Sequence, residues 1–228
     1  MISRLLPKRV RAWVRRQVPG FPRASSGFDA SQYWESRYAA GGTSGEGSYG
    51  RLATFKAEVL NGFIAEHNCV SAIELGCGDG NQLSLLTVPA YIGLDVSRSV
   101  VQLCIARFGD DYTKSFFLFD AQCFRDPSRL FHADLAMSLD VIYHVVDDAA
   151  FQAYMTALCA ASDKHLIIYS TDYESEDLGH QRHRAVSSWM KSCTDFAFVR
   201  AIENPYLGSV DGHEQSEAKF LIYRRMES

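Results

Sequence analysis

The chain has 228 residues, of which 47% are apolar and 22% are charged, and its formal net charge is -4. This length fits one α/β domain with an N-terminal extension better than two full domains. The negative net charge argues against a protein whose whole surface binds nucleic acid. No apolar run approaches the roughly 20 residues that span a bilayer. The six cysteines form no C-x-x-C pair, which indicates reduced thiols of a cytoplasmic protein rather than disulfides or a zinc site.

Residues 1–28 are predicted to be a separate basic extension, and 29–228 the globular domain. No acidic residue precedes Asp29, whereas seven basic residues do: Arg4, Lys8, Arg9, Arg11, Arg15, Arg16 and Arg23. Apolar residues recur among them at helical spacing until Pro19. A basic amphipathic helix could lie on an anionic membrane surface or dock on a partner. A solvated tail is the competing interpretation.

Beyond the extension, helical and strand patterns alternate. The first part of the domain is predicted to hold helices at 31–39 and 51–68, a strand at 70–75, a short helix after Asp79 and a strand at 90–95. The middle part is predicted to hold a helix at 98–108, a strand at 115–120, a weak helix near 127–131, a strand at 133–139, a helix at 149–161 and a strand at 165–170. A helix at 185–193 and strands at 196–202 and 218–223 are predicted to follow. This order predicts an α/β fold with a doubly wound, mostly parallel, seven-stranded Rossmann-like sheet. The last two strands are expected to pair antiparallel at a sheet edge.

The clearest motif is AIELGCGDG at 72–80, where an apolar strand runs into a glycine turn. Glycines there let the backbone approach a ligand at the carboxyl end of a parallel strand. Asp95 ends the next strand and is placed to accept hydrogen bonds from two ribose hydroxyls. Asn81 stands where a dinucleotide fingerprint has its third glycine. Glu74 would repel a pyrophosphate but suits an ammonium and a sulfonium, so the motif favours S-adenosylmethionine (SAM) over NAD. A nicotinamide-dependent oxidoreductase is the alternative enzyme class.

From Tyr33 to about Ser170 the sequence resembles the class I SAM-dependent methyltransferases. The resemblance implies that SAM is held at the strand ends by Glu74, Gly76, Cys77, Gly78, Asp95, Val96, Asp120, Ala121 and Leu139. Tyr33 and Arg37 could cover the SAM carboxylate, because an arginine fork suits that group. A helix that merely packs on the sheet is the alternative. The glycine-rich loop 41–50 could act as a lid, or be an ordinary surface loop.

Four segments are similar to small bacterial methyltransferases encoded with glycan-building enzymes, among them O-methyltransferases that act on mannosides of mycobacterial polysaccharides. These segments are YWESRY at 33–38, the loop 41–50, LDVIYH at 139–144 and IIYS at 167–170. The similarity implies a small-molecule hydroxyl as methyl acceptor, on a sugar or oligosaccharide. RNA or protein methylation and a non-catalytic SAM-binding protein are the alternatives. The N-P-P-Y-type tetrapeptide of amino-group methylation is absent, since LDVI stands in its place.

The candidate catalytic residues are His144 and Asp140. His144 follows the fourth strand, where a base could take the hydroxyl proton, although it could also merely pack beside the cofactor. Asp140 could orient His144, hold a divalent cation such as Mg²⁺, or cap the turn. Acceptor contacts are expected from Tyr143, His180, Arg182 and His183, with a solvated loop as the alternative. The expected partners are a small-molecule acceptor, a membrane surface through 1–28 and a second copy in a homodimer, with nucleic acid disfavoured.

Overall fold

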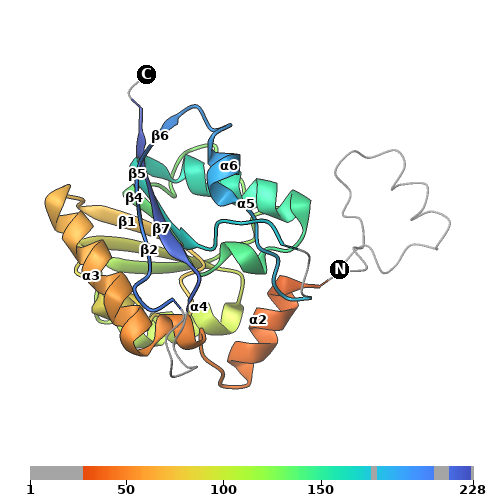
Figure 1. The fold of residues 1–228 in the computed structure, drawn as a ribbon. Coiled ribbons are helices and arrows are strands. Elements are labelled where there is room, and N and C mark those ends of the chain that lie inside the picture. The colour runs from red at the N-terminus through yellow and green to blue at the C-terminus, as the bar shows by residue number, and fades with distance from the viewer. Residues whose placement is uncertain (1–27, 176–178, 208–215, 227–228) are drawn as a thin grey trace.

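A seven-stranded sheet forms the centre of the computed structural model, which describes residues 28–175, 179–207 and 216–226 (Figure 1). The strand order is β3-β2-β1-β4-β5-β7-β6. The strands are β1 (Ser71–Leu75), β2 (Ala90–Asp95), β3 (Lys114–Leu118), β4 (Ala133–Leu139), β5 (Ser162–Ser170), β6 (Phe196–Ile202) and β7 (Lys219–Arg225). The α-helices are α2 (Ala30–Ala39), α3 (Gly50–Glu66), α4 (Arg98–Phe108), α5 (Asp148–Ala160) and α6 (Val186–Met190). The predicted extension 1–28 lies outside the described residues except for Phe28.

Helices cover both faces of the sheet (Figure 1), because alternate residues of each strand face opposite sides. One apolar cluster joins α3 and α4 to one face and includes Ile167 of β5. A second cluster joins α5 and α6 to the other face and includes the flanking residues Leu166 and Ile168. Strand β4 is buried along its whole length. The predicted doubly wound sheet is therefore confirmed.

The pairing of the strands is mostly parallel. Strands β1 to β5 pair in parallel, whereas β7 runs antiparallel to both β5 and β6. The antiparallel pairing of the last two strands is thus confirmed, with β7 placed between β5 and the edge strand β6. Within the described residues, no helix is both long and apolar enough to cross a membrane.

Three local expectations change in the structure, besides β5, which begins three residues before the predicted 165, and α6, which ends three residues before the predicted 193. The helix after Asp79 is a single 3-10 turn, η3 (Leu83–Leu85), as the short spacing to β2 required. Strand β3 ends two residues early, because its partner β2 ends at Asp95 and the register stops there. The weak helix near 127–131 does not form. The Asp126 carboxylate instead accepts the amides of Leu130 and Phe131, each at 2.8 Å, and so replaces the carbonyls of a helix.

Candidate active site

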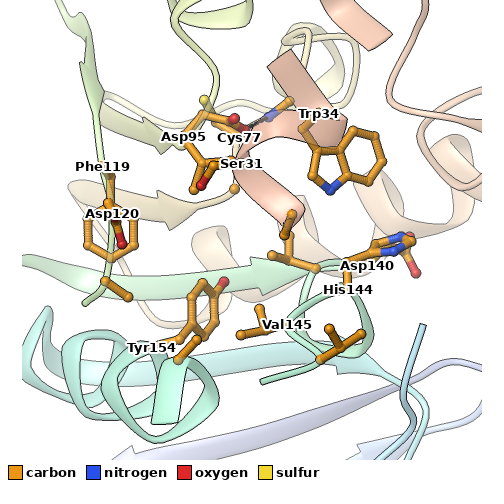
Figure 2. Close-up of a pocket in the computed structure, with 18 of the residues that line it drawn as sticks. Ser31, Trp34, Cys77, Asp95, Phe119, Asp120, Asp140, His144, Val145 and Tyr154 are labelled. Carbon is orange, nitrogen blue, oxygen red and sulfur yellow. Dashed lines mark hydrogen bonds between the residues drawn. The ribbon is translucent and has the colours of Figure 1, made fainter. Parts of the chain in front are cut away.

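A cavity of about 1300 Å³ opens at the carboxyl ends of the parallel strands, where open α/β sheets bind ligands. Eleven of the residues predicted from the sequence line it: Glu74, Gly76, Cys77, Gly78, Asp95, Val96, Asp120, Ala121, Leu139, Asp140 and His144. Phe119 and Asp120 lie at one end of the cavity in Figure 2, and Asp140 and His144 lie at the other. The structure therefore brings the predicted cofactor residues and the predicted base into one space.

The glycine turn after β1 is packed too closely for side chains. Gly76 and Gly78 have φ angles of 84° and 56°, in the left-handed region that favours glycine. A Cβ on Gly76 would lie 2.4 Å from Cγ2 of Val141, and a Cβ on Gly78 would lie 2.3 Å from Oγ of Ser44. These glycines therefore allow the loop before α3 and the turn after β4 to close around the end of β1.

Asp95 is fixed by the turn that it faces. Its Oδ2 accepts the amide of Gly78 and its Oδ1 accepts the amide of Ser97, both at 3.0 Å. Burial raises the pKa of Asp95 to about 6. A carboxylate can accept about four hydrogen bonds in all, so Asp95 retains room for a further donor beside the amides of Ser97, Gly78 and Val96. That capacity suits a ribose hydroxyl.

Glu74 is a buried acid in the middle of the site. Its Oε2 accepts a hydrogen bond from the Tyr91 hydroxyl at 2.5 Å. Burial raises the pKa of Glu74 to about 7, although the Tyr91 hydrogen bond and the Lys56 charge oppose that rise. A cationic ligand beside this carboxyl would favour its ionised form. The predicted preference of Glu74 for a sulfonium and an ammonium is consistent with this environment.

Asp140 lies in a left-handed conformation, with φ of 60°, directly after β4. Its Oδ2 is 2.7 Å from Nζ of Lys56 and its Oδ1 accepts the Tyr143 hydroxyl at 3.0 Å. Because an ammonium already compensates the charge of this carboxylate, the donor set does not favour Mg²⁺. Among the described residues, no cluster of three or more metal-ligating side chains occurs.

Sequence reasoning missed Lys56, which is fully buried on α3 and lines the cavity. A signal for it exists in the sequence, since Lys56 lies four residues from both Leu52 and Leu60 on the apolar stripe of this helix. A lysine in such a stripe requires a buried partner. That partner, Asp140, is 84 residues away in the chain, so spacing alone could not identify it.

His144 ends a 3-10 turn, η4 (Ile142–His144), at the edge of the cavity. Its Nδ1 is 3.1 Å from the carbonyl oxygen of His180. A carbonyl only accepts, so Nδ1 carries the proton of the neutral ring and Nε2 keeps its lone pair. Burial is the largest influence on the pKa of His144 and lowers it. The rings of Trp34 and His144 contact each other in a T-shaped arrangement, with their centroids 5.0 Å apart.

Tyr33 and Arg37 do not line this cavity, contrary to the expectation that they cover the SAM carboxylate. Trp34 and Tyr38 of the same helix line it instead, because residues four apart share one face of a helix. Nε of Arg37 donates to the carbonyl of Thr43 at 2.7 Å. The neighbouring face of α2, rather than the expected one, is turned toward the site.

The four expected acceptor residues lie around the cavity and are absent from its described lining. Tyr143 bonds to Asp140, and the His180 ring stacks on His144 with centroids 6.0 Å apart. Arg182 forms an ion pair with Asp148 at 2.9 Å. His183 bonds through Nδ1 to the Thr171 hydroxyl at 2.7 Å. In this structure Arg182 and His183 therefore support neighbouring loops, while Tyr143 and His180 contact the candidate catalytic residues.

The glycine-rich loop 41–50 is docked on the glycine turn through Asp79. Oδ2 of Asp79 accepts hydrogen bonds from the Ser44 amide and the Tyr49 hydroxyl, both at 2.8 Å. The Asp79 amide donates in return to the Ser44 hydroxyl at 2.8 Å. Gly47 lies over Asp140, since a Cβ there would be 2.8 Å from Oδ2 of Asp140. The loop thus closes against both the glycine turn and the end of β4.

Comparison with known proteins identifies this architecture. No protein-family model and no curated protein matches the chain. Among solved structures, the N-methyltransferase NodS from Bradyrhizobium japonicum WM9, in complex with S-adenosyl-L-homocysteine (SAH), has a TM-score of 0.68 and 15% identity over 88% of this chain and 100% of that chain. This chain has the methyltransferase fold.

Two further methyltransferase structures agree. Magnesium protoporphyrin IX methyltransferase (ChlM) from Synechocystis PCC 6803, with bound SAM, has a TM-score of 0.63 and 14% identity, over 89% of this chain and 100% of that one. The methyltransferase domain of bacterial CtHen1-C has a TM-score of 0.58 and 20% identity, over 75% and 97% of the two chains. At these identities the likeness establishes the fold, and the chemistry must be argued from the residues.

Proposed function

We propose that this protein is a SAM-dependent O-methyltransferase whose acceptor is a hydroxyl of a neutral small molecule, a sugar or oligosaccharide. Three acids at the ends of adjacent strands support the choice of cofactor. Asp120 follows β3, Asp95 ends β2 and Glu74 lies in β1 before the glycine turn. Asp120 suits the adenine amino group of SAM, Asp95 suits the ribose diol, and Glu74 suits the cationic methionine end. When bound, SAM supplies an electrophilic methyl group.

The geometry of His144 carries the proposal that an oxygen is methylated. It lies beside Asp140 at the end of the cavity that the methyl group would reach in this orientation (Figure 2). Nδ1 of His144 donates a hydrogen bond to the His180 carbonyl, so Nε2 can accept the proton of an acceptor hydroxyl. When the oxygen bonded to the methyl carbon, the bond from that carbon to the SAM sulfur would break, and its electron pair would stay on the sulfur of the SAH that leaves. The O–H electron pair would stay on the oxygen, and the proton would pass to Nε2 of His144. Burial lowers the pKa of His144 and so favours the neutral ring, which is the form that can accept that proton.

The charge of the cavity argues against an anionic acceptor. Its lining includes seven acids: Asp29, Glu74, Asp95, Asp120, Asp140, Asp147 and Asp148. Among the described lining residues, Lys56 is the one lysine or arginine, and it is already paired with Asp140. Such a surface disfavours the phosphates of RNA. Aromatic rings, including Trp34, offer apolar faces to the C–H face of a sugar, while the carboxylates accept its hydroxyls.

A SAM-consumption screen tests this function. Neutral sugars and oligosaccharides, phenols, small amines and short RNAs would be offered to the full chain, and SAH release would be measured. We expect turnover with neutral sugars and a methyl ether in the product. Turnover restricted to amines or RNA would reject the proposed acceptor. SAH binding without turnover on any acceptor would instead support a non-catalytic SAM-binding protein.

A further inference from the structure

A second, shallower depression of about 560 Å³ lies beside the cavity, on the outer side of the beginning of α2. Its lining is Phe28, Asp29, Gln32, Tyr33, Ser36 and Arg37. Phe28 and Asp29 also line the main cavity, so the two spaces meet at these residues. The depression therefore adjoins the candidate active site, with Phe28 and Asp29 at the boundary of the two.

A series of aromatic rings connects the candidate base to this depression. The rings of His144 and His180 stack with centroids 6.0 Å apart and planes 17° apart. The His180 ring stacks in turn on Tyr33, at 5.7 Å and 23°. Tyr33 then contacts Phe28 at 5.2 Å. These spacings are those of interacting aromatic pairs, so the rings form a continuous track from the catalytic end outward.

The chemistry of the depression combines ring faces with short polar groups. Phe28 and Tyr33 supply apolar surface, while the side chains of Asp29, Gln32 and Arg37 supply acceptors and donors. Asp29 is held in place because its Oδ1 accepts the Gln32 amide at 3.0 Å as the N-cap of α2. Pyranose rings have the matching chemistry, with an apolar C–H face and a rim of hydroxyls.

We propose that this depression binds the sugar units next to the one that is methylated, so that the acceptor is an oligosaccharide rather than a monosaccharide. This proposal rests on the proposed function. Phe28 and Tyr33, at the outer end of the aromatic track, would support these sugar units beside the cavity. Tyr33 is thereby assigned to acceptor binding and not to the cofactor, because it lines the depression and not the cavity.

The test compares acceptors of increasing length. Monosaccharides, disaccharides and tetrasaccharides of glucose, mannose and galactose would be assayed with the wild-type chain, Tyr33→Ala, Tyr33→Phe and Tyr112→Ala. Tyr112 is a matched control, because it is 96% exposed and belongs to neither depression nor cavity. We expect the wild-type KM to be roughly tenfold lower for the tetrasaccharide than for the monosaccharide, which is about 1.4 kcal/mol of extra binding. Tyr33→Ala should bring this ratio close to one, whereas Tyr33→Phe and Tyr112→Ala should preserve it.

SAH affinity, measured by calorimetry for each variant, separates the possible failures. Methylation of sugars without any dependence on length would overturn the proposed subsite and leave sugar methylation standing. A Tyr33→Ala variant that loses SAH affinity but keeps the length dependence would also overturn it, because Tyr33 would then serve the cofactor. If no sugar of any length is methylated while SAH binds, the proposed acceptor fails, and the subsite proposal fails with it.

Discussion

At the scale of single residues, His144 decides the proposed chemistry. His144→Ala should lower turnover by about 10²–10⁴-fold, the usual contribution of a positioned base, while SAH affinity stays unchanged. His132→Ala is a matched control, since His132 is an exposed histidine outside the cavity lining. His180 or His183 could replace the lost base, so the double variants belong in the same steady-state assay. Near-normal turnover in every combination would exclude a histidine base.

The proposed base role of His144 also predicts how kcat/KM depends on pH. Because burial lowers the pKa of His144, kcat/KM for the acceptor, measured at saturating SAM, should rise with pH around a midpoint below the ordinary histidine value of about 6.5 and then stay level. The direction follows from the base role, since only the neutral ring accepts a proton. A midpoint clearly above that value, or a profile that falls with pH in this range, would contradict the assignment.

Glu74 should make cofactor binding depend on pH. Its pKa is raised to about 7, so the carboxyl gains charge as the pH rises past neutrality. A sulfonium prefers the ionised carboxyl, and the Kd of SAM should therefore decrease by up to about tenfold between roughly pH 6 and pH 8. SAH lacks the sulfonium charge and should respond less. Calorimetry of both ligands measures this difference, and Glu74→Gln should remove it.

At the scale of elements, the loop 41–50 depends on Asp79. Asp79 is buried and accepts two hydrogen bonds from this loop. Asp79→Ala should lower the free energy of unfolding by about 1–3 kcal/mol, because it leaves the half-buried Ser44 amide and Tyr49 hydroxyl without this partner. It should also weaken SAH binding and speed hydrogen exchange in 41–50, as measured by mass spectrometry. Glu46→Ala, an exposed change on the same loop, is the control; equal exchange in both variants would mean that Asp79 does not hold the loop.

At the scale of the whole molecule, the predicted division between extension and domain falls next to Phe28. Phe28 lines both the cavity and the adjacent depression, so a truncation should remove residues 1–27 and spare it. We expect that truncation to keep SAH affinity but to reduce binding to anionic vesicles, most clearly at low salt. Co-sedimentation with vesicles measures the effect. Equal sedimentation of the two proteins would reject the membrane role.

The sequence by itself determined the sheet and the strand ends that line the cavity. Strand periodicity and glycine turns are local signals, and parallel strands bring their carboxyl ends to one edge whatever packs around them. Asp95 and Glu74 could be placed for this reason. The strand bounds depended on partners, as the early end of β3 at the limit of β2 illustrates.

Only the tertiary structure decided which helix faces meet the site. The rotation of α2 turned Trp34 and Tyr38 inward and left Tyr33 and Arg37 outside. The pairing of Lys56 with Asp140 likewise joins residues 84 positions apart. A helix's rotation is set by its packing against distant elements, and the energy of such contacts is not encoded in the spacing of neighbouring residues. The surroundings of His144 and Asp140 therefore became visible only when these elements were assembled.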